Sequence, residues 1–267
     1  MKLHIKLLFL IFSVVVLSSC SGYNKLLKHG TYEEKYEAAL KYYNEGSYVK
    51  AYPLLEELVP VLRGTAKAEE IYYYYAYCNY FMQDYEFANF HFKNFVKTYP
   101  SSDKAKDCFY MSAYTYYLTS PEPSLDQTNT YKAIAEMQAF VNRYPESDKV
   151  AEANDIIDKL RLKLETKAYN QCKQYFKTRK YKAAVIYINA TLKDYPATKY
   201  REELRYIIVK SNYLYAVRSF ESKQEERFMN TIESYKSFVE KFPKSKFSKE
   251  LQDIYFDSIA QLEKLSS

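Results

Sequence analysis

The sequence predicts an all-α protein: an α-solenoid of about five helix pairs, closed by a C-terminal capping helix. The first observation is a segment related to Phe-Val-x-x-Tyr-Pro-x-Ser that occurs four times. Its prolines lie 45, 51 and 47 residues apart, and periods of this size are typical of stacked helical repeats. The second observation is a Tyr-x-x-Ala motif upstream of these segments, where a small residue lets two helices approach closely. Together the two patterns place one helix pair in each period.

Residues 1–19 have the layout of a lipoprotein signal peptide. Two lysines precede an apolar run from Leu7 to Leu17, which is shorter than the about 20 apolar residues that a membrane-spanning helix needs. The tetrad Leu17-Ser18-Ser19-Cys20 resembles the bacterial lipobox, in which the cysteine becomes the new N-terminus. By that resemblance Cys20 carries a covalent lipid, and two or more acyl chains anchor a protein stably. The alternative is an ordinary secretory signal that is cut near Ser18 and leaves a plain thiol.

Residues 20–30 are predicted to be a lipidated N-terminal linker. Ser21 follows Cys20 at the position where an aspartate would resemble the inner-membrane retention signal of many bacteria with two membranes. No acidic run that resembles a surface-export signal follows the cysteine. We therefore expect the acyl anchor to insert into the lipid of the outer membrane and the protein to face the periplasm.

Residues 31–267 are predicted to form one repeat domain, with repeats at roughly 31–63, 64–100, 101–145, 146–196 and 197–243 and a cap at 244–267. The second helix of each repeat resembles that of a tetratricopeptide repeat, with an alanine near its start and a proline after its end. Ala88, Phe92, Phe95 and Pro100 follow this pattern fully. The first and last copies depart from it.

Those departures are Arg63 in place of the first proline and Thr231 in place of the last alanine. Because proline cannot continue a helix, the proline of each of the four segments is predicted to end one. The hydroxyl residue that follows is predicted to cap the next helix; these residues are Ser102, Ser147, Thr198 and Ser245. Two prolines make residues 118–129 an exposed loop inside the third repeat. Residues 150–177 lack glycine and proline and are predicted to form one extended helix.

The sequence offers little for catalysis, and no cofactor is expected beyond the lipid on Cys20. His29 and His91 are the histidines outside the signal peptide, and neither has a Cys or His at metal-ligand spacing. No glycine cluster could cradle a phosphate. The formal net charge of +6 comes from interspersed charges, which argues against nucleic acid. The cysteines of the repeat region are expected to be small buried hydrophobes; they are Cys78, Cys108 and Cys172.

Tyrosine is the abundant residue, with 32 copies and no tryptophan. In the first helix of repeat two, Tyr72, Tyr75 and Ala76 are expected to face the core. Other tyrosines then fall on a different stripe with i, i+4, i+7 spacing, which lines the concave groove in tetratricopeptide proteins. The predicted groove residues are Tyr36, Tyr43, Tyr73, Tyr77, Tyr80, Tyr110, Tyr114 and Tyr117. The alternative is that these rings pack between neighbouring helices.

The lipobox, the five long tetratricopeptide-like repeats and the insertion in repeat three together resemble the BamD family of outer-membrane assembly lipoproteins. The resemblance implies a non-catalytic scaffold of the β-barrel assembly machinery. It also implies two partners: the periplasmic domains of a BamA-like barrel protein, bound mainly by the C-terminal repeats, and unfolded outer-membrane proteins, received near the N-terminal repeats. The tyrosine stripe would capture an extended client strand.

Two other interpretations of the sequence remain open. A repeat scaffold for cell-envelope division or peptidoglycan upkeep could be built from the same elements. A lipoprotein that binds glycans or nutrients could use the aromatic residues to stack on sugar rings, although the chain has no tryptophan.

Overall fold

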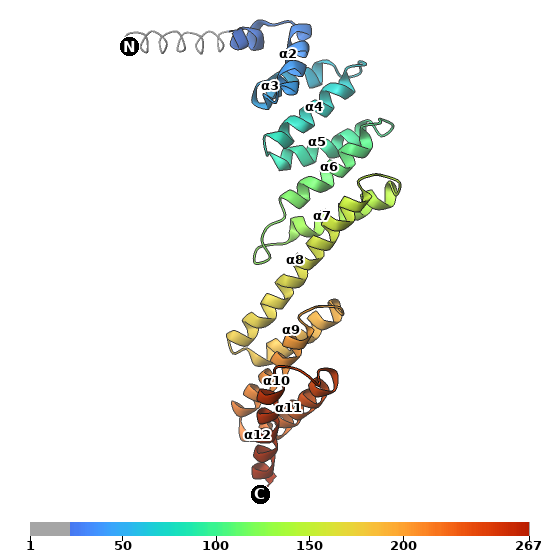
Figure 1. The fold of residues 1–267 in the computed structure, drawn as a ribbon. Coiled ribbons are helices and arrows are strands. Elements are labelled where there is room, and N and C mark those ends of the chain that lie inside the picture. Colours follow the sequence, from blue (N-terminus) through green and yellow to red (C-terminus); the bar gives the residue numbers. More distant parts are fainter. Residues whose placement is uncertain (1–21, 267) are drawn as a thin grey trace, which may run out of the picture. The chain divides into compact units, whose positions relative to one another are not determined.

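The computed structural model describes residues 22–266, and within them the chain is helical with no β-strand (Figure 1). The predicted signal peptide and Cys20 lie outside the described residues. The chain is helical over residues 22–29, and the helices that follow are α2 (Tyr32–Asn44), α3 (Tyr48–Val61), α4 (Ala68–Phe81), α5 (Tyr85–Thr98), α6 (Ala105–Leu118), α7 (Thr128–Arg143), α8 (Val150–Lys177), α9 (Tyr181–Asp194), α10 (Arg201–Val217), α11 (Glu221–Lys241) and α12 (Ser248–Ser266). The predicted all-α fold is confirmed. Across the described part of the chain no helix is both long and apolar enough to cross a bilayer.

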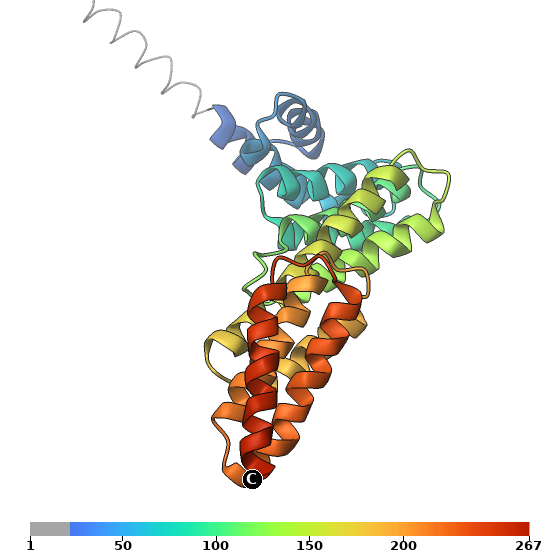
Figure 2. The ribbon, with the colours of Figure 1, turned by 60° about the horizontal axis from the view of Figure 1, so that its bottom comes forward.

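The described chain divides into two compact units. Unit 1 holds residues 22–121 and Asp126–Leu160, and unit 2 holds Glu122–Leu125 and the residues from Arg161 onward. Helix α8 has 28 residues, as the lack of glycine and proline predicted, and contributes to both units. In unit 1 the helices from α2 to α7 pack one on the next in chain order, and in unit 2 the helices from α9 to α12 lie side by side (Figures 1 and 2).

The Tyr-Pro and Phe-Pro pairs end helices in the same way at each copy. The residue before the proline closes α5, α7, α9 and α11 with φ between −121° and −134° and ψ between 59° and 71°. Proline disfavours the α conformation for the residue that precedes it, although Pro53 and Pro60 lie inside α3. The four pairs therefore mark where α5, α7, α9 and α11 stop.

The small residues of the repeat pattern are fully buried and form the centre of each helix pair. Ala51, Ala88, Ala133 and Ala184 have no exposed surface, and neither has Thr231, which replaces the last alanine. The Thr231 hydroxyl donates to the carbonyl oxygen of Arg227 at 3.0 Å, one turn earlier in α11. This internal bond satisfies the hydroxyl and explains how a polar residue fits the alanine position.

The hydroxyl residues after the prolines do not cap the next helix, so that prediction was wrong. The Ser102 hydroxyl accepts from the backbone N–H of Lys104 at 3.0 Å, and Thr198 accepts from Tyr200 at 3.1 Å. Lys104 and Tyr200 are themselves the N-caps, and neither has a side-chain cap bond. Each hydroxyl instead closes a turn that leads from one helix pair to the next.

Candidate functional site

Tyrosine hydroxyls on the first helices of unit 1 bond to carboxylates on the following helix pair. Tyr36 on α2 donates to Glu70 on α4 at 2.7 Å. Tyr73 on α4 donates to Asp107 on α6 at 3.0 Å, and Tyr77 donates to the same carboxylate oxygen. Each of these carboxylates lies in the first turn of its helix, where the helix dipole favours negative charge. The hydroxyls therefore link successive helix pairs.

The same linkage continues in unit 2, where the sequence analysis placed no site. Tyr169 donates to Glu203 at 2.7 Å, and Tyr206 donates to Glu250 at 2.8 Å. In each case a tyrosine on one first helix bonds to a carboxylate at the start of the next. A structural role between repeats thus accounts for a part of the tyrosine content.

The eight predicted groove tyrosines differ in how much surface they offer. Tyr36 is 8% exposed and Tyr110 is 4% exposed. Burial and the neighbouring Glu70 raise the pKa of the Tyr36 hydroxyl to about 12. The Tyr110 hydroxyl is buried near Glu152 without completing a hydrogen bond to any described residue. The other six tyrosines are half-buried. Whether the stripe binds a client stays a prediction, but Tyr36 and Tyr110 offer almost no ring surface.

Four of these half-buried tyrosines belong to a wider cluster, which we call the aromatic band. Its members are Tyr43, Tyr48, Tyr80, Phe81, Tyr85, Tyr114 and Tyr117. Tyr48 stacks on Phe81 with ring centroids 4.3 Å apart, and Tyr80 lies 5.3 Å from Phe81. Tyr80 also reaches Tyr114 on α6 at 6.5 Å. The band therefore runs without a break from α2 and α3 to α6, and Phe81 is 41% exposed within it.

Sequence reasoning missed three members of the band. Tyr48 and Tyr85 are the first residues of α3 and α5 and open the Tyr-x-x-Ala motif. Because a tight turn brings the start of the second helix beside the end of the first, these rings meet the last aromatic residues of the preceding helix. Phe81 ends α4 four residues after Tyr77, so extending the tyrosine stripe by one turn would have found it.

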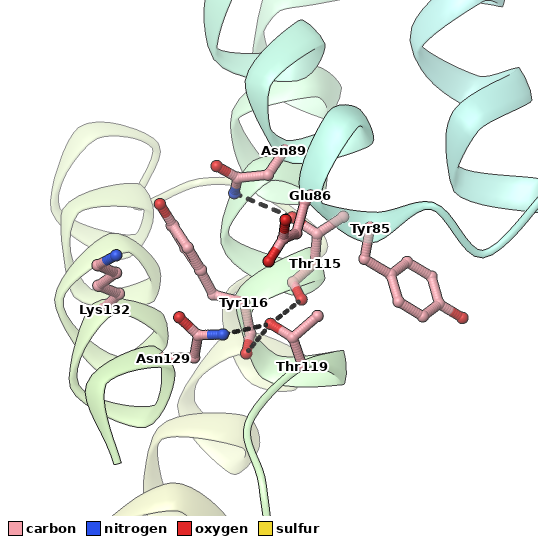
Figure 3. A pocket seen from close by; sticks show the side chains of 8 residues that line it. All are labelled: Tyr85, Glu86, Asn89, Thr115, Tyr116, Thr119, Asn129 and Lys132. Carbon is pink, nitrogen blue, oxygen red and sulfur yellow. Dashed lines mark hydrogen bonds between the residues drawn. The ribbon is translucent and has the colours of Figure 1, made fainter. Parts of the chain in front are cut away.

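A polar pocket lies between α5, α6 and α7 (Figure 3). Its volume is about 190 Å³. The Asn89 amide donates to the Ser112 carbonyl oxygen at 2.6 Å and to the Thr115 hydroxyl at 3.0 Å, and Asn129 donates to the Thr119 hydroxyl at 3.2 Å. Since these amides already bond to neighbouring helices, we interpret the pocket as a packing feature where the second and third repeats meet.

The cysteines occupy core positions, whereas His29 is exposed and His91 is half-buried. Cys78, Cys108 and Cys172 are buried free thiols, which confirms the prediction. Burial raises the pKa of the Cys78 thiol to about 12, which suppresses thiolate chemistry. Burial lowers the pKa of His91. Within residues 22–266 no group of three or more His, Cys, Asp or Glu side chains could hold a metal ion.

Comparison with known proteins gives one matching family and two relatives that are named BamD. The model of the family described as "YfiO: Outer membrane lipoprotein" matches residues 28–218. An outer membrane protein assembly factor BamD of Aquifex aeolicus is 25% identical over 239 residues, covering 86% of this chain and 76% of the relative. The BamD of Caulobacter vibrioides is 26% identical over 117 residues, covering 44% of this chain and 38% of that protein.

Two solved structures are also similar. The tetratricopeptide domain of P58(IPK) is 13% identical, with a TM-score of 0.41 and coverage of 90% of this chain and 68% of that one. A human IFIT1 dimer with PPP-AAAA is 14% identical, with a TM-score of 0.30 and coverage of 93% and 61%.

The stacked helix pairs define a tetratricopeptide-like repeat protein. The chain belongs to the YfiO family of outer membrane lipoproteins, whose model matches more than two thirds of it. It is therefore a non-catalytic member of the BamD-like outer-membrane protein assembly factors.

Proposed function

We propose that this protein is a lipid-anchored, periplasm-facing subunit of the β-barrel assembly machinery. It binds the periplasmic domains of a BamA-like barrel protein and receives unfolded outer-membrane proteins for folding and insertion. Family membership supports the assembly role. The observation that carries the client-binding part is the continuous aromatic band of unit 1, because partly exposed rings at a helix-repeat surface suit extended, aromatic-rich clients.

The start of the described chain supports anchoring close to the membrane. The helix over residues 22–29 begins two residues after Cys20. Tyr23 in that helix donates to the Lys50 carbonyl oxygen at 2.9 Å, and its ring lies 5.6 Å from that of Tyr42. A lipid on Cys20 would therefore hold the first helix pair near the membrane surface, because the intervening segment is docked against that pair.

We divide the proposed client residues into two groups by their contacts and burial. Tyr43, Tyr80, Tyr114 and Tyr117 belong to the aromatic band and can contact a client directly. Tyr73 and Tyr77 donate hydrogen bonds to Asp107, while Tyr36 and Tyr110 are buried, so we assign these four a structural role. Tyr48, Phe81 and Tyr85 join the first group.

Co-purification tests the proposal. The tagged, lipidated protein is extracted from its own membranes in mild detergent, and the proteins that accompany it are identified by mass spectrometry. We expect a stoichiometric barrel protein with periplasmic repeat domains, together with outer-membrane protein clients. Recovery of peptidoglycan or division proteins instead would favour the envelope-scaffold interpretation, and a stabilising effect of oligosaccharides on melting would favour glycan binding.

In the same experiment, a double substitution distinguishes client binding from binding of the barrel protein. Tyr48→Ala with Phe81→Ala removes a stacked pair from the aromatic band, and we expect it to deplete clients while retaining the barrel protein. Phe220→Ala is the matched control, because Phe220 is 89% exposed and lies in unit 2, outside the band. Equal client recovery from the band variant and the control would refute the assignment of the band.

A further inference from the structure

The first helix of the described chain, residues 22–29, is docked on the fold by one face, and we call it the N-terminal helix (Figure 1). Tyr23, Leu26 and Leu27 are half-buried and pack against the buried core around α2 and α3. The helix ends at Gly30, whose N–H donates to the Leu26 carbonyl oxygen at 2.8 Å. A Cβ on Gly30 would lie 2.5 Å from that oxygen, so this close approach needs a glycine. The N-terminal helix therefore has a defined orientation on the first helix pair.

The solvent face of the N-terminal helix carries positive charge. Lys25 and Lys28 are exposed, and residues 22–32 contain no acidic residue. Lys50 is also exposed, and its carbonyl oxygen accepts from the Tyr23 hydroxyl at 2.9 Å, which places the start of α3 beside this helix. None of the three lysines forms an ion pair within the described part of the chain. We call Lys25, Lys28 and Lys50 the basic surface.

Glu34 offsets a part of this charge at Lys25. The Glu34 carboxylate accepts from the backbone N–H of Thr31 at 2.7 Å and completes the capping box of α2. The hydrogen bonds from Thr31 lower the pKa of Glu34, and the charge of Lys25 adds to the effect. Glu34 thus compensates one lysine in part and leaves the other two lysines of the basic surface without a paired carboxylate among the described residues.

The other acidic residues of α2 and of its C-terminal end lie beside different partners. Glu33 pairs with Lys67, the N-cap of α4, at 2.8 Å. Glu37 lies near Tyr36, whose hydroxyl bonds to α4, so both carboxylates lie on the side of α2 that faces α4. Glu45 pairs with a lysine one turn earlier at 4.0 Å. These carboxylates therefore leave the charge of the basic surface in place.

The predicted lipid on Cys20 would hold the basic surface at the membrane. Tyr23 follows Cys20 by three residues, and a chain extended at about 3.3–3.6 Å per residue spans roughly 10 Å over that length. Exposed charges interact over a Debye length of about 8 Å at physiological ionic strength. Val49, which is next to Lys50 and 74% exposed, offers an apolar side chain to the same interface. The inference that follows rests on the lipid anchor of the proposed function.

We propose that the basic surface binds the anionic phospholipid headgroups of the bilayer that holds the acyl anchor. Lysines close to an anionic membrane surface are attracted to it, and the attraction adds up over neighbouring lysines. The lysine ammonium is a compact charge with three donors, which suits phosphate oxygens. Because the N-terminal helix is docked on α2 and α3, this contact sets which face of unit 1 meets the bilayer. A lipid on a free linker would leave that face unspecified.

Lysine acetylation, mapped by mass spectrometry, tests the contact on the lipidated mature chain. The chain is reconstituted into vesicles of phosphatidylcholine and into vesicles of phosphatidylcholine and phosphatidylglycerol in equal parts. We expect Lys28 and Lys50 to react at least threefold more slowly in the anionic vesicles, and the difference to disappear at about 1 M salt, where the Debye length is about 3 Å. Lys244, an exposed lysine of unit 2, should react equally in both.

Flotation of the vesicles separates the anchor from the basic surface. A chain that floats with both kinds of vesicle but shows equal acetylation of the basic surface in the two would refute this inference and leave the anchor intact. A chain that does not float with the neutral vesicles would lack the anchor, and the inference would fall together with that part of the proposed function.

A pair of matched variants shows whether the lysines act together. Lys25→Gln with Lys28→Gln removes two charges of the basic surface, and we expect the protection of Lys50 in anionic vesicles to fall by at least half. Lys97→Gln with Lys106→Gln makes the same charge change at exposed positions of α5 and α6, and the protection of Lys50 should persist. If both variants protect Lys50 equally, the protection comes from the general potential of the membrane, and the basic surface is not a binding face.

Discussion

Replacement of Asp107 by alanine tests whether tyrosine hydroxyls fasten successive helix pairs. Asp107 accepts hydrogen bonds from Tyr73, at 3.0 Å, and from Tyr77. A hydrogen bond to a charged group contributes about 1.5–3 kcal/mol, and an acidic residue in the first turn of a helix adds about 0.3–1 kcal/mol. Asp107 is partly exposed, so solvent weakens each bond and the low end applies. We expect the free energy of opening of α4 against α6 to fall by about 3 kcal/mol.

Native-state hydrogen exchange is the right assay, because a chain of two compact units need not unfold in one step. Amide protection is compared in α4 and α6 for Asp107→Ala and for the control Asp103→Ala, an exposed carboxylate in the preceding turn. The control should change protection by no more than about 0.5 kcal/mol. A double-mutant cycle with Tyr77→Phe then isolates the pair. If Asp107→Ala behaves like the control, the hydroxyl–carboxylate link does not hold the helix pairs together.

Three further predictions concern pH, a turn and a loop. The pKa of Tyr36 is raised to about 12, so the folded protein holds the phenol proton more tightly than the unfolded chain does. The resulting contribution to stability is complete below about pH 10 and is lost as the pH rises from about 10 to 12. Tyrosinate absorbance and circular dichroism measure this loss, and unfolding that begins below about pH 9 would contradict the prediction. A Cβ on Gly30 would lie 2.5 Å from a backbone carbonyl oxygen, so Gly30→Ala should loosen residues 22–29 by about 1–3 kcal/mol, seen as faster amide exchange there and not in α9. The Lys167 ammonium donates to the Leu125 carbonyl oxygen at 2.7 Å, so Lys167→Met should speed proteolysis of the loop before α7, and unchanged cleavage would show that this bond does not restrain the loop.

Local rules explain why the helix architecture could be predicted from the sequence. The Tyr-Pro pairs at the repeat ends disfavour the α conformation of the residue before proline, and they end α5, α7 and α9 as expected. Tyr52-Pro53, by contrast, lies within α3. The absence of glycine and proline from 150 to 177 likewise left α8 uninterrupted. These signals act within a few residues, so neighbouring repeats are not needed to interpret them.

The features that the sequence analysis missed depend on residues far apart in the chain. Tyr36 and Glu70, like Tyr73 and Asp107, are 34 residues apart, and their bonds form only after one helix pair stacks on the next. The hydroxyls after the prolines also bond to residues far away in the chain. Ser102 donates to Glu69 on the preceding first helix, and Thr198 donates to Glu165 at 2.6 Å. These hydroxyl residues, which the sequence suggested as local helix caps, therefore connect neighbouring repeats.

A tyrosine can contribute both its ring and its hydroxyl, so a test of the proposed client-binding surface has to separate the two. Alanine at Tyr73 or Tyr77 removes both a ring and a bond to Asp107, so a loss of binding could come from a loosened repeat. Tyr73→Phe keeps the ring and removes only the hydroxyl, and it should lower the protection of α4 with little effect on client binding. Phe81→Ala has no hydroxyl to lose and should do the reverse, because Phe81 is 41% exposed at the centre of the aromatic band. If instead Tyr73→Phe lost clients as strongly as Phe81→Ala, the hydroxyls would themselves belong to the recognition surface, and the division into supporting and contacting tyrosines would be wrong.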